Sequence, residues 1–220
     1  MNKITIAIDG FSSTGKSTVA KQLAKHLGYV YVDTGAMYRA VTYYAMQNGL
    51  IKENDFNKEA LIYQLPKIKI NVYLNGENIE RQIRTLEVSS FVSKVAAVSE
   101  VREQLVAQQQ QMGKDKGVVM DGRDIGTVVF TDAELKLFMT ASAEKRALRR
   151  YDELIERGDD VTYEAVLKNV QDRDHIDTTR KDSPLVKAKD AIEIDNSNLS
   201  LKEQFDKILQ LAIMTIESCE

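Results

Sequence analysis

The sequence predicts an α/β fold in which a five-stranded parallel sheet is flanked by helices. The first 48 residues alternate short apolar runs with amphipathic stretches, in the order strand, helix, strand, helix. That order is typical of a parallel sheet covered by helices. The apolar runs are rich in β-branched residues and carry few polar ones, as expected for strands buried on both faces. Runs at 118–120, 135–139 and 191–194 supply three further strands.

The N-terminal elements can be assigned in order. The first strand is predicted over residues 4–8 and precedes a glycine-containing turn. The helix after this turn carries Val19, Leu23 and Leu27 on one stripe, which is the spacing of a face packed against a core. Gly28 is expected to end that helix, because glycine readily adopts the left-handed conformation of a helix C-cap. A second strand covers 29–32, and a second helix follows it.

The pattern changes after the second helix. Residues 68–74 alternate apolar and polar side chains, and Asn75-Gly76 follows them. This combination indicates a β-hairpin in an antiparallel sheet with one solvated face. We therefore expect residues 62–84 to form a small inserted β lobe, and residues 1–61 and 85–220 to form the core domain. One helical stretch is expected after the lobe, across 88–105.

The late part of the chain is rich in charge. Between positions 144 and 182, 20 of 39 residues are charged, with both signs mixed. Such a segment is typical of a solvated helical face, and it also suits a mobile lid over a charged substrate. We expect a helical lid over about 150–182, Ser142 as the N-cap of its first helix, and a last helix starting with the capping box Ser200–Glu203.

Composition limits the partners and the compartment. The net charge of −3 argues against nucleic acid and anionic membranes, which bind a broadly basic surface. The single cysteine excludes an internal disulfide framework and a cysteine-based zinc site. No apolar run is long enough for a membrane span or a signal peptide. We expect a cytoplasmic protein, and a monomer.

The most specific motif is the turn after the first strand. Residues 10–17 match G-x-x-x-x-G-K-[ST] between a buried strand and an amphipathic helix, which predicts the P-loop NTPase fold. Backbone N–H groups of such a loop surround phosphate oxygens, the lysine places positive charge at the β- and γ-phosphates, and the following serine offers a hydroxyl to Mg²⁺. A GTPase is disfavoured because no N-K-x-D motif is present. The predicted phosphate-binding residues are Gly10, Phe11, Ser12, Ser13, Thr14, Gly15, Lys16, Ser17 and Thr18.

Three further clusters suit the same cleft. Two of them, 33–39 and 121–127, follow the carboxyl ends of predicted strands, where ligands bind in open α/β sheets. Asp121 stands where a Walker B carboxylate positions Mg²⁺ or its waters. The third cluster, 173–180, places arginines in the charged segment, where a closing lid can bring them to a transferring phosphoryl group.

Together the four clusters resemble the bacterial cytidylate kinases, nucleoside monophosphate kinases that phosphorylate CMP and dCMP from ATP. The match runs through almost the whole chain and includes 93–97 and 101–102. The resemblance implies ATP and Mg²⁺ as cofactors, with Ser17 on the metal and Asp121 reaching it through water. It also implies that the 62–84 lobe binds the nucleoside monophosphate. The sequence departs from the common pattern at Phe11, where a proline is usual.

The resemblance also implies individual roles. Lys16, Arg123 and Arg180 would be catalytic, and Thr34 would contact the acceptor. It assigns the CMP phosphate to Arg39, Arg123 and Arg180, the cytosine edge to Ser93, Arg102 and Asp124, and the ribose to Arg173 and Asp177.

Two alternatives stay open at this point. One is a P-loop kinase for another small acceptor, such as UMP, AMP or a shikimate-like alcohol. An alcohol acceptor needs a general base, and Asp33 or Asp124 could serve. The other is a nucleotide-binding regulatory protein that turns over no small molecule.

Overall fold

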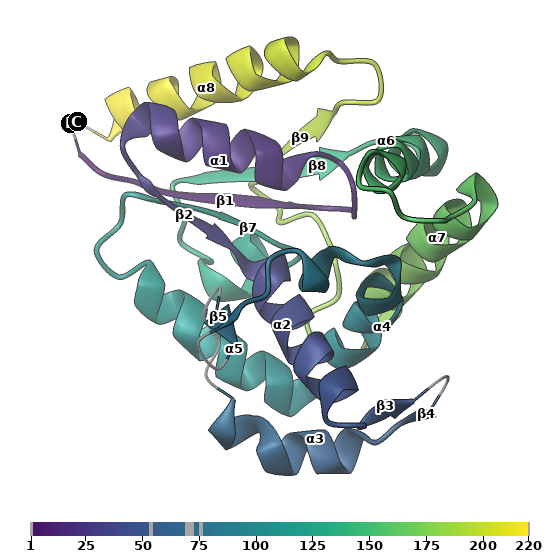
Figure 1. The fold of residues 1–220 in the computed structure, drawn as a ribbon. Helices are drawn as coiled ribbons and strands as arrows, with labels where there is room; N and C mark the ends of the chain where they lie inside the picture. Colours follow the sequence, from purple (N-terminus) through teal and green to yellow (C-terminus); the bar gives the residue numbers. More distant parts are fainter. Residues whose placement is uncertain (1, 53–54, 69–72, 75–76, 220) are drawn as a thin grey trace.

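The computed structural model describes residues 2–52, 55–68, 73–74 and 77–219. Its central sheet confirms the predicted five parallel strands, in the order β2-β7-β1-β8-β9 (Figure 1). The strands are β1 (Thr5–Gly10), β2 (Val30–Asp33), β7 (Val118–Asp121), β8 (Leu135–Thr140) and β9 (Ile192–Asp195). The three central strands β7, β1 and β8 are buried at nearly every position, which explains their continuous apolar runs.

One face of the sheet is covered by α1 (Lys16–Leu27) and α8 (Leu201–Ser218). Ile6 and Ile8 of β1 pack into the core that these helices share. Gly28 ends α1 in the left-handed conformation, and the Ser200–Glu203 capping box starts α8, both as predicted.

The other face of the sheet is covered by α5 (Ser99–Met112) and by a single π-helical turn, η3 (Ile125–Val129). Beyond them, α2 (Thr34–Gln47) and α4 (Leu86–Ala96) form a second core with α3 (Lys58–Gln64). The single helix predicted across 88–105 is wrong. Val98 is extended and serves as the N-cap of α5, so the stretch is divided into α4 and α5.

The insert is only partly a β lobe. Antiparallel pairing of β5 (Tyr73–Leu74) with β6 (Glu77–Asn78) confirms a hairpin about positions 75–76, although 69–72 and 75–76 lie outside the described residues. The segment before it holds a second short hairpin, β3 (Ile51–Lys52) with β4 (Asp55–Phe56), and then α3. Two 3₁₀ turns, η1 (Leu65–Lys67) and η2 (Gln82–Arg84), complete the insert.

The charged segment forms two helices that pack on each other, α6 (Ala143–Glu156) and α7 (Tyr163–Thr179), so its predicted helical character is confirmed, whereas its role as a lid stays a prediction (Figure 1). Ser142 caps α6 as predicted, and its hydroxyl accepts from Lys145 N. The two helices share a small apolar core of their own around Ala147, Leu154 and Val166. The two helices therefore form a folded unit with an apolar core of its own.

Candidate active site

A cavity of about 610 Å³ opens at the carboxyl ends of β1, β2 and β7. Its wall combines the P-loop with α2, α4, the loop after β7 and the lid helices. The structure thus brings all the predicted acceptor residues into one space, namely Thr34, Arg39, Ser93, Arg102, Arg123, Asp124, Arg173, Asp177 and Arg180. From the P-loop, its wall includes Ser12, Ser13, Gly15, Lys16, Ser17 and Thr18. Gly10, Phe11 and Thr14 are not part of that wall.

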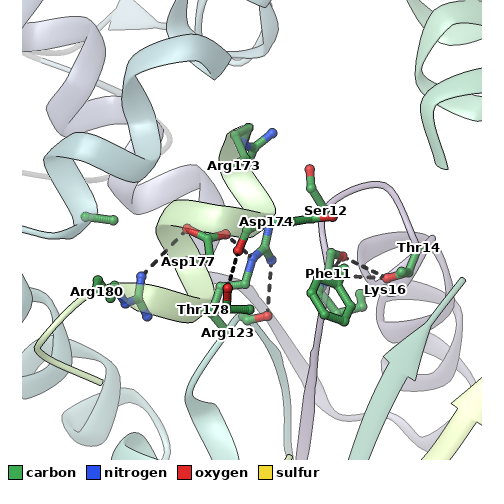
Figure 2. Close-up of polar contacts among 12 residues, drawn as sticks. Phe11, Ser12, Thr14, Lys16, Arg123, Arg173, Asp174, Asp177, Thr178 and Arg180 are labelled. Carbon is green, nitrogen blue, oxygen red and sulfur yellow. Dashed lines mark hydrogen bonds and ion pairs between the residues drawn. The ribbon is translucent and has the colours of Figure 1, made fainter. Parts of the chain in front are cut away.

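The P-loop begins at a position that only glycine can occupy. Gly10 has a φ of +143°, and a Cβ there would lie 2.0 Å from the Met139 carbonyl oxygen of the adjacent strand. The loop ends on Gly15, whose left-handed conformation serves as the N-cap of α1. The Lys16 ammonium folds back over the loop and donates to the Phe11 carbonyl and to Thr14 Oγ1 (Figure 2). Burial, assisted by the nearby Arg123, holds the pKa of Lys16 well below its usual value.

A second group of side chains lies at the start of α1. Ser17 Oγ donates to Asp121 Oδ2 at 2.9 Å, and the Tyr31 hydroxyl donates to the other carboxylate oxygen at 2.9 Å. Thr34 Oγ1 donates to the Asp121 carbonyl oxygen at 2.8 Å. Asp121 is therefore held through both its side chain and its backbone. Burial and the neighbouring Asp33 raise the pKa of Asp121 to about 6. Ser17 and Asp121 thus place a hydroxyl and a carboxylate side by side, and oxygen groups of this kind suit Mg²⁺.

A buried ion pair lies at the far end of the cavity. The Arg102 guanidinium donates to Asp124 Oδ2, and the two side chains are only 4% and 5% exposed. Burial outweighs the surrounding arginines and raises the pKa of Asp124 above its usual value. Ser93, also buried, lines the same end. Donor and acceptor groups thus lie together in the wall of the cavity.

Asp177 of α7 lies between two arginines from different elements (Figure 2). It accepts from Arg123 Nε at 3.0 Å and pairs with Arg180 at 3.9 Å. Although burial disfavours its charge, these arginines and Arg173 together lower its pKa. Burial and Arg123 in turn lower the pKa of Arg173 to about 9. The cluster therefore carries more positive charge than its one carboxylate offsets.

Three arginines that line the cavity share a feature at their Nε atoms. The Nε atoms of Arg39, Arg102 and Arg173 are buried and have no hydrogen-bond partner among the described residues. A buried donor without a partner destabilises a protein by about 1–3 kcal/mol, and native structures contain few of them. All three arginines line the same cavity, and their positive charge makes that cavity suited to an anionic ligand.

Arg84 is a cavity residue that sequence reasoning missed. Asp33 accepts from Arg39 at 3.0 Å and from Arg84 at 3.3 Å, and these two arginines lower its pKa despite its burial. The Arg84 carbonyl accepts from two lid arginines, Arg150 at 2.6 Å and Arg157 at 3.0 Å. The position follows the hairpin in a stretch without strand or helix periodicity, so no local signal indicated it.

Arg146 of α6 was also missed. It donates to both carboxylate oxygens of Asp174, at 3.0 and 2.6 Å, and to the Ser12 carbonyl at 3.3 Å. Its guanidinium also lies over the Phe11 ring, 5.1 Å from the centroid. Arg146 thus connects the P-loop to α7. In the sequence it is one charge among many in the lid segment, which hid this role.

The third missed residue is Asp9, the buried residue before the P-loop. Its carboxylate accepts from Ile125 N and Gly126 N, each at 2.7 Å. Burial outweighs these bonds, and the pKa of Asp9 is raised to about 7, with Asp124 adding to the shift and Lys16 opposing it. A charged residue ending an apolar strand was the only sequence signal.

The raised pKa of Asp9 predicts a pH-dependent stability. Between about pH 4 and 7 the folded chain binds a proton at Asp9 that the unfolded chain has lost, so the free energy of unfolding falls as the pH rises through this range. Relative to Asp9→Asn, the wild type should lose about 1.4 kcal/mol per pH unit between pH 5 and 7, and little more above pH 8. Urea unfolding of both proteins from pH 5 to 8 measures this. A difference that stays constant across the range would contradict the assignment.

Fold and cavity together define a P-loop phosphotransferase, because a phosphate-binding loop faces an arginine-rich pocket within one cleft. Comparison with known proteins gives the particular family. The family model described as "Cytidylate kinase" matches residues 6–214, and the chain belongs to that family.

Curated relatives agree with this assignment. A cytidylate kinase of Flavobacterium johnsoniae is 69% identical over 222 residues, covering 96% of each chain. One of Bacteroides fragilis is 58% identical over 215 residues, covering 93% of this chain and 94% of its own. Among solved structures, an uncharacterized protein from Eubacterium ventriosum shares the fold, with a TM-score of 0.50, 14% identity and 99% coverage of both chains. Among the described helices, none combines the length and apolar character needed to cross a bilayer.

Proposed function

We propose that this protein transfers the γ-phosphoryl group of ATP to CMP and dCMP, forming CDP and dCDP. The observation that carries the proposal is one cavity in which a P-loop faces Arg39, Arg123 and Arg173 and the buried Arg102–Asp124 pair. Membership in the cytidylate kinase family supports CMP as the acceptor. The dCMP activity and the residue roles below belong to the proposal.

The donor side would hold the triphosphate of ATP. The loop from Gly10 to Thr18 supplies backbone N–H groups, and Lys16 supplies charge at the β- and γ-phosphates once it leaves the Phe11 carbonyl. The adjacent oxygens of Ser17 and Asp121 suit Mg²⁺, with Asp121 acting through a water. Mg²⁺ held there would neutralise negative charge on the phosphates.

The base side would read cytosine by its hydrogen-bonding edge. Cytosine offers an N4 amino donor together with acceptors at N3 and O2. Asp124 can accept from the amino group, while Arg102 and Ser93 can donate to the acceptors. Uracil has a carbonyl where cytosine has the amino group, so it would face a buried carboxylate. The pairing of Arg102 with Asp124 holds both groups in place before the ligand arrives.

The acceptor phosphate would lie between the two sides. Arg39, Arg123 and Arg180 would bind it, with Thr34 beside them, while Arg173 and Asp177 would contact the ribose. The attacking phosphate oxygen is already anionic near neutral pH, so no general base is required. Catalysis then comes from positioning and charge neutralisation, and Lys16, Arg123 and Arg180 supply the charge.

The proposal also covers organisation. Every group named above comes from one chain, which supports a monomer. The insert, about 62–84, would close over the nucleoside monophosphate, and the lid, about 150–182, would close over both substrates. The single cysteine supports a cytoplasmic location.

A panel of acceptors tests the proposed function. ADP release is measured with ATP, Mg²⁺ and each of CMP, dCMP, UMP, AMP and shikimate. We expect CMP and dCMP to be phosphorylated with a kcat/KM at least about 10²-fold above that of UMP, because a buried carboxylate facing the wrong edge is strongly discriminating. Turnover of another acceptor without CMP or dCMP would point to a different kinase. ATP hydrolysis that CMP leaves unchanged would point to a regulatory protein.

A further inference from the structure

Asp9 joins the two halves of the active site through the protein interior. It is the last residue of β1 before Gly10, where the P-loop turns away, and it is 5% exposed. Its side chain points to the sheet face that carries η3. Both of its carboxylate oxygens accept from consecutive backbone N–H groups at the start of that turn.

These two bonds determine where the acceptor-reading loop ends. The loop runs from Asp121 to Asp124, and its first residue is held by Ser17, Tyr31 and Thr34. Its last residue directly precedes Ile125, whose N–H Asp9 accepts. Arg123 and Asp124 therefore lie between two anchored points, and the second anchor is one residue from the P-loop.

The side chains around Gly126 pack closely against the turn that Asp9 contacts. Gly126 has no Cβ, and a Cβ built there would lie 3.4 Å from Asp9 Oδ2 and 3.2 Å from Lys136 Cδ. A carboxylate is an expensive group to bury, and this one has no ion-pair partner within 4.0 Å among the described residues. An apolar side chain could fill the space, but it would leave both N–H groups without an acceptor.

We propose that Asp9 is a positioning residue that sets Arg123 and Asp124 against the P-loop, so that the acceptor is held at the correct place for transfer. Asp9 touches neither nucleotide in this arrangement and acts through the Ile125–Gly126 turn. The inference rests on the proposed function, since the loop that it positions is the one assigned to CMP.

Asp9→Asn tests the inference at nearly constant size. An amide has one acceptor oxygen, and its NH₂ group faces the other backbone N–H, so the turn must move away. We expect the KM for CMP to rise about tenfold and kcat to fall about tenfold, while the dissociation constant of ATP changes less than twofold. The measurements are steady-state kinetics with CMP varied and calorimetric titration with ATP.

Thr127→Val is the matched control. It changes the same turn, and the Thr127 hydroxyl is buried without a hydrogen-bond partner in the described part of the chain. Its KM for CMP and its kcat should stay within twofold of the wild type. Gly126→Ala provides a second test if Asp9→Asn fails to fold, since it retains the carboxylate and places a methyl group 3.4 Å from Asp9 Oδ2 and 3.2 Å from Lys136 Cδ, which crowds this contact. It should raise the KM for CMP about threefold.

Three outcomes would overturn the inference. The first is an unchanged KM for CMP in Asp9→Asn, or in Gly126→Ala if Asp9→Asn does not fold. The second is an equal loss of CMP and ATP binding, which would indicate general damage to the P-loop. A Thr127→Val variant as impaired as Asp9→Asn would also count against it. Titration of the wild type with CMP separates this failure from that of the proposed function. A wild type that does not bind CMP refutes the function itself, whereas a normal wild type with a normal Asp9→Asn refutes the positioning role alone.

Discussion

Lys16→Met should lower kcat about 10³-fold or more while leaving the fold intact. In the free protein the Lys16 ammonium donates to the Phe11 carbonyl and to Thr14 Oγ1, so it already lies at the mouth of the P-loop. Replacing Lys16 by methionine removes a positive charge that would stabilise the transferring phosphoryl group. A single contribution of this kind is worth about 10²–10³ or more in rate. The lowered pKa shows that burial disfavours this charge, so the free energy of unfolding should not decrease.

The measurement is single-turnover transfer from ATP to CMP, with urea unfolding alongside. Lys25→Met is the matched control, because Lys25 lies on the exposed face of the same helix. It should leave kcat and the unfolding free energy within error of the wild type. A Lys16→Met protein with kcat within tenfold of the wild type would refute the role given to Lys16.

Arg123→Met is the second substitution with a large expected effect. Arg123 is bonded to Asp177 at 3.0 Å, and its charge also acts on Lys16, so it lies between the donor and acceptor sides. We expect kcat to fall about 10³-fold, because an arginine on the transferring group is worth about that much. The KM for CMP should rise as well, since the same guanidinium is assigned to its phosphate.

The fold should survive this change, because Asp177 keeps Arg180 and Arg173 as neighbours. Arg81→Met removes an exposed arginine of the insert and serves as the control. The dissociation constant of ATP, measured by calorimetry, should move little in either variant. Loss of ATP binding in Arg123→Met equal to its loss of CMP binding would show that Arg123 does not belong to the acceptor side.

The centre of the sheet could be predicted because β7, β1 and β8 are largely apolar runs, as expected for strands that are buried at nearly every position. The P-loop and the segment after β7 could be predicted because phosphate binding requires particular residues at consecutive positions. The insert was harder. Its helix α3 begins with an Asn57 cap but is only seven residues long, too short to show a helical period, so the alternation farther along dominated the interpretation.

The missed residues share a physical cause. Arg84, Arg146 and Asp9 act through partners that are distant in the chain, and 116 residues separate Asp9 from Ile125. Each acts partly through backbone atoms, as acceptor, donor or carbonyl, and backbone atoms have no signature in a sequence. Long-range partners of this kind can be identified only when the fold has brought the elements together.

The insert contacts Arg150 and Arg157 through the backbone carbonyl of Arg84. Every amino acid has such a carbonyl, so this contact does not depend on the side chain at position 84. Replacing the residue at position 84 therefore changes the charge beside Asp33 without removing the acceptor that Arg150 and Arg157 share. Because both arginines donate to the same carbonyl oxygen, loss of either one leaves the other hydrogen bond in place. A substitution at position 84 can therefore alter the electrostatics of the acceptor pocket while the hydrogen bonds that connect the insert to Arg150 and Arg157 are retained.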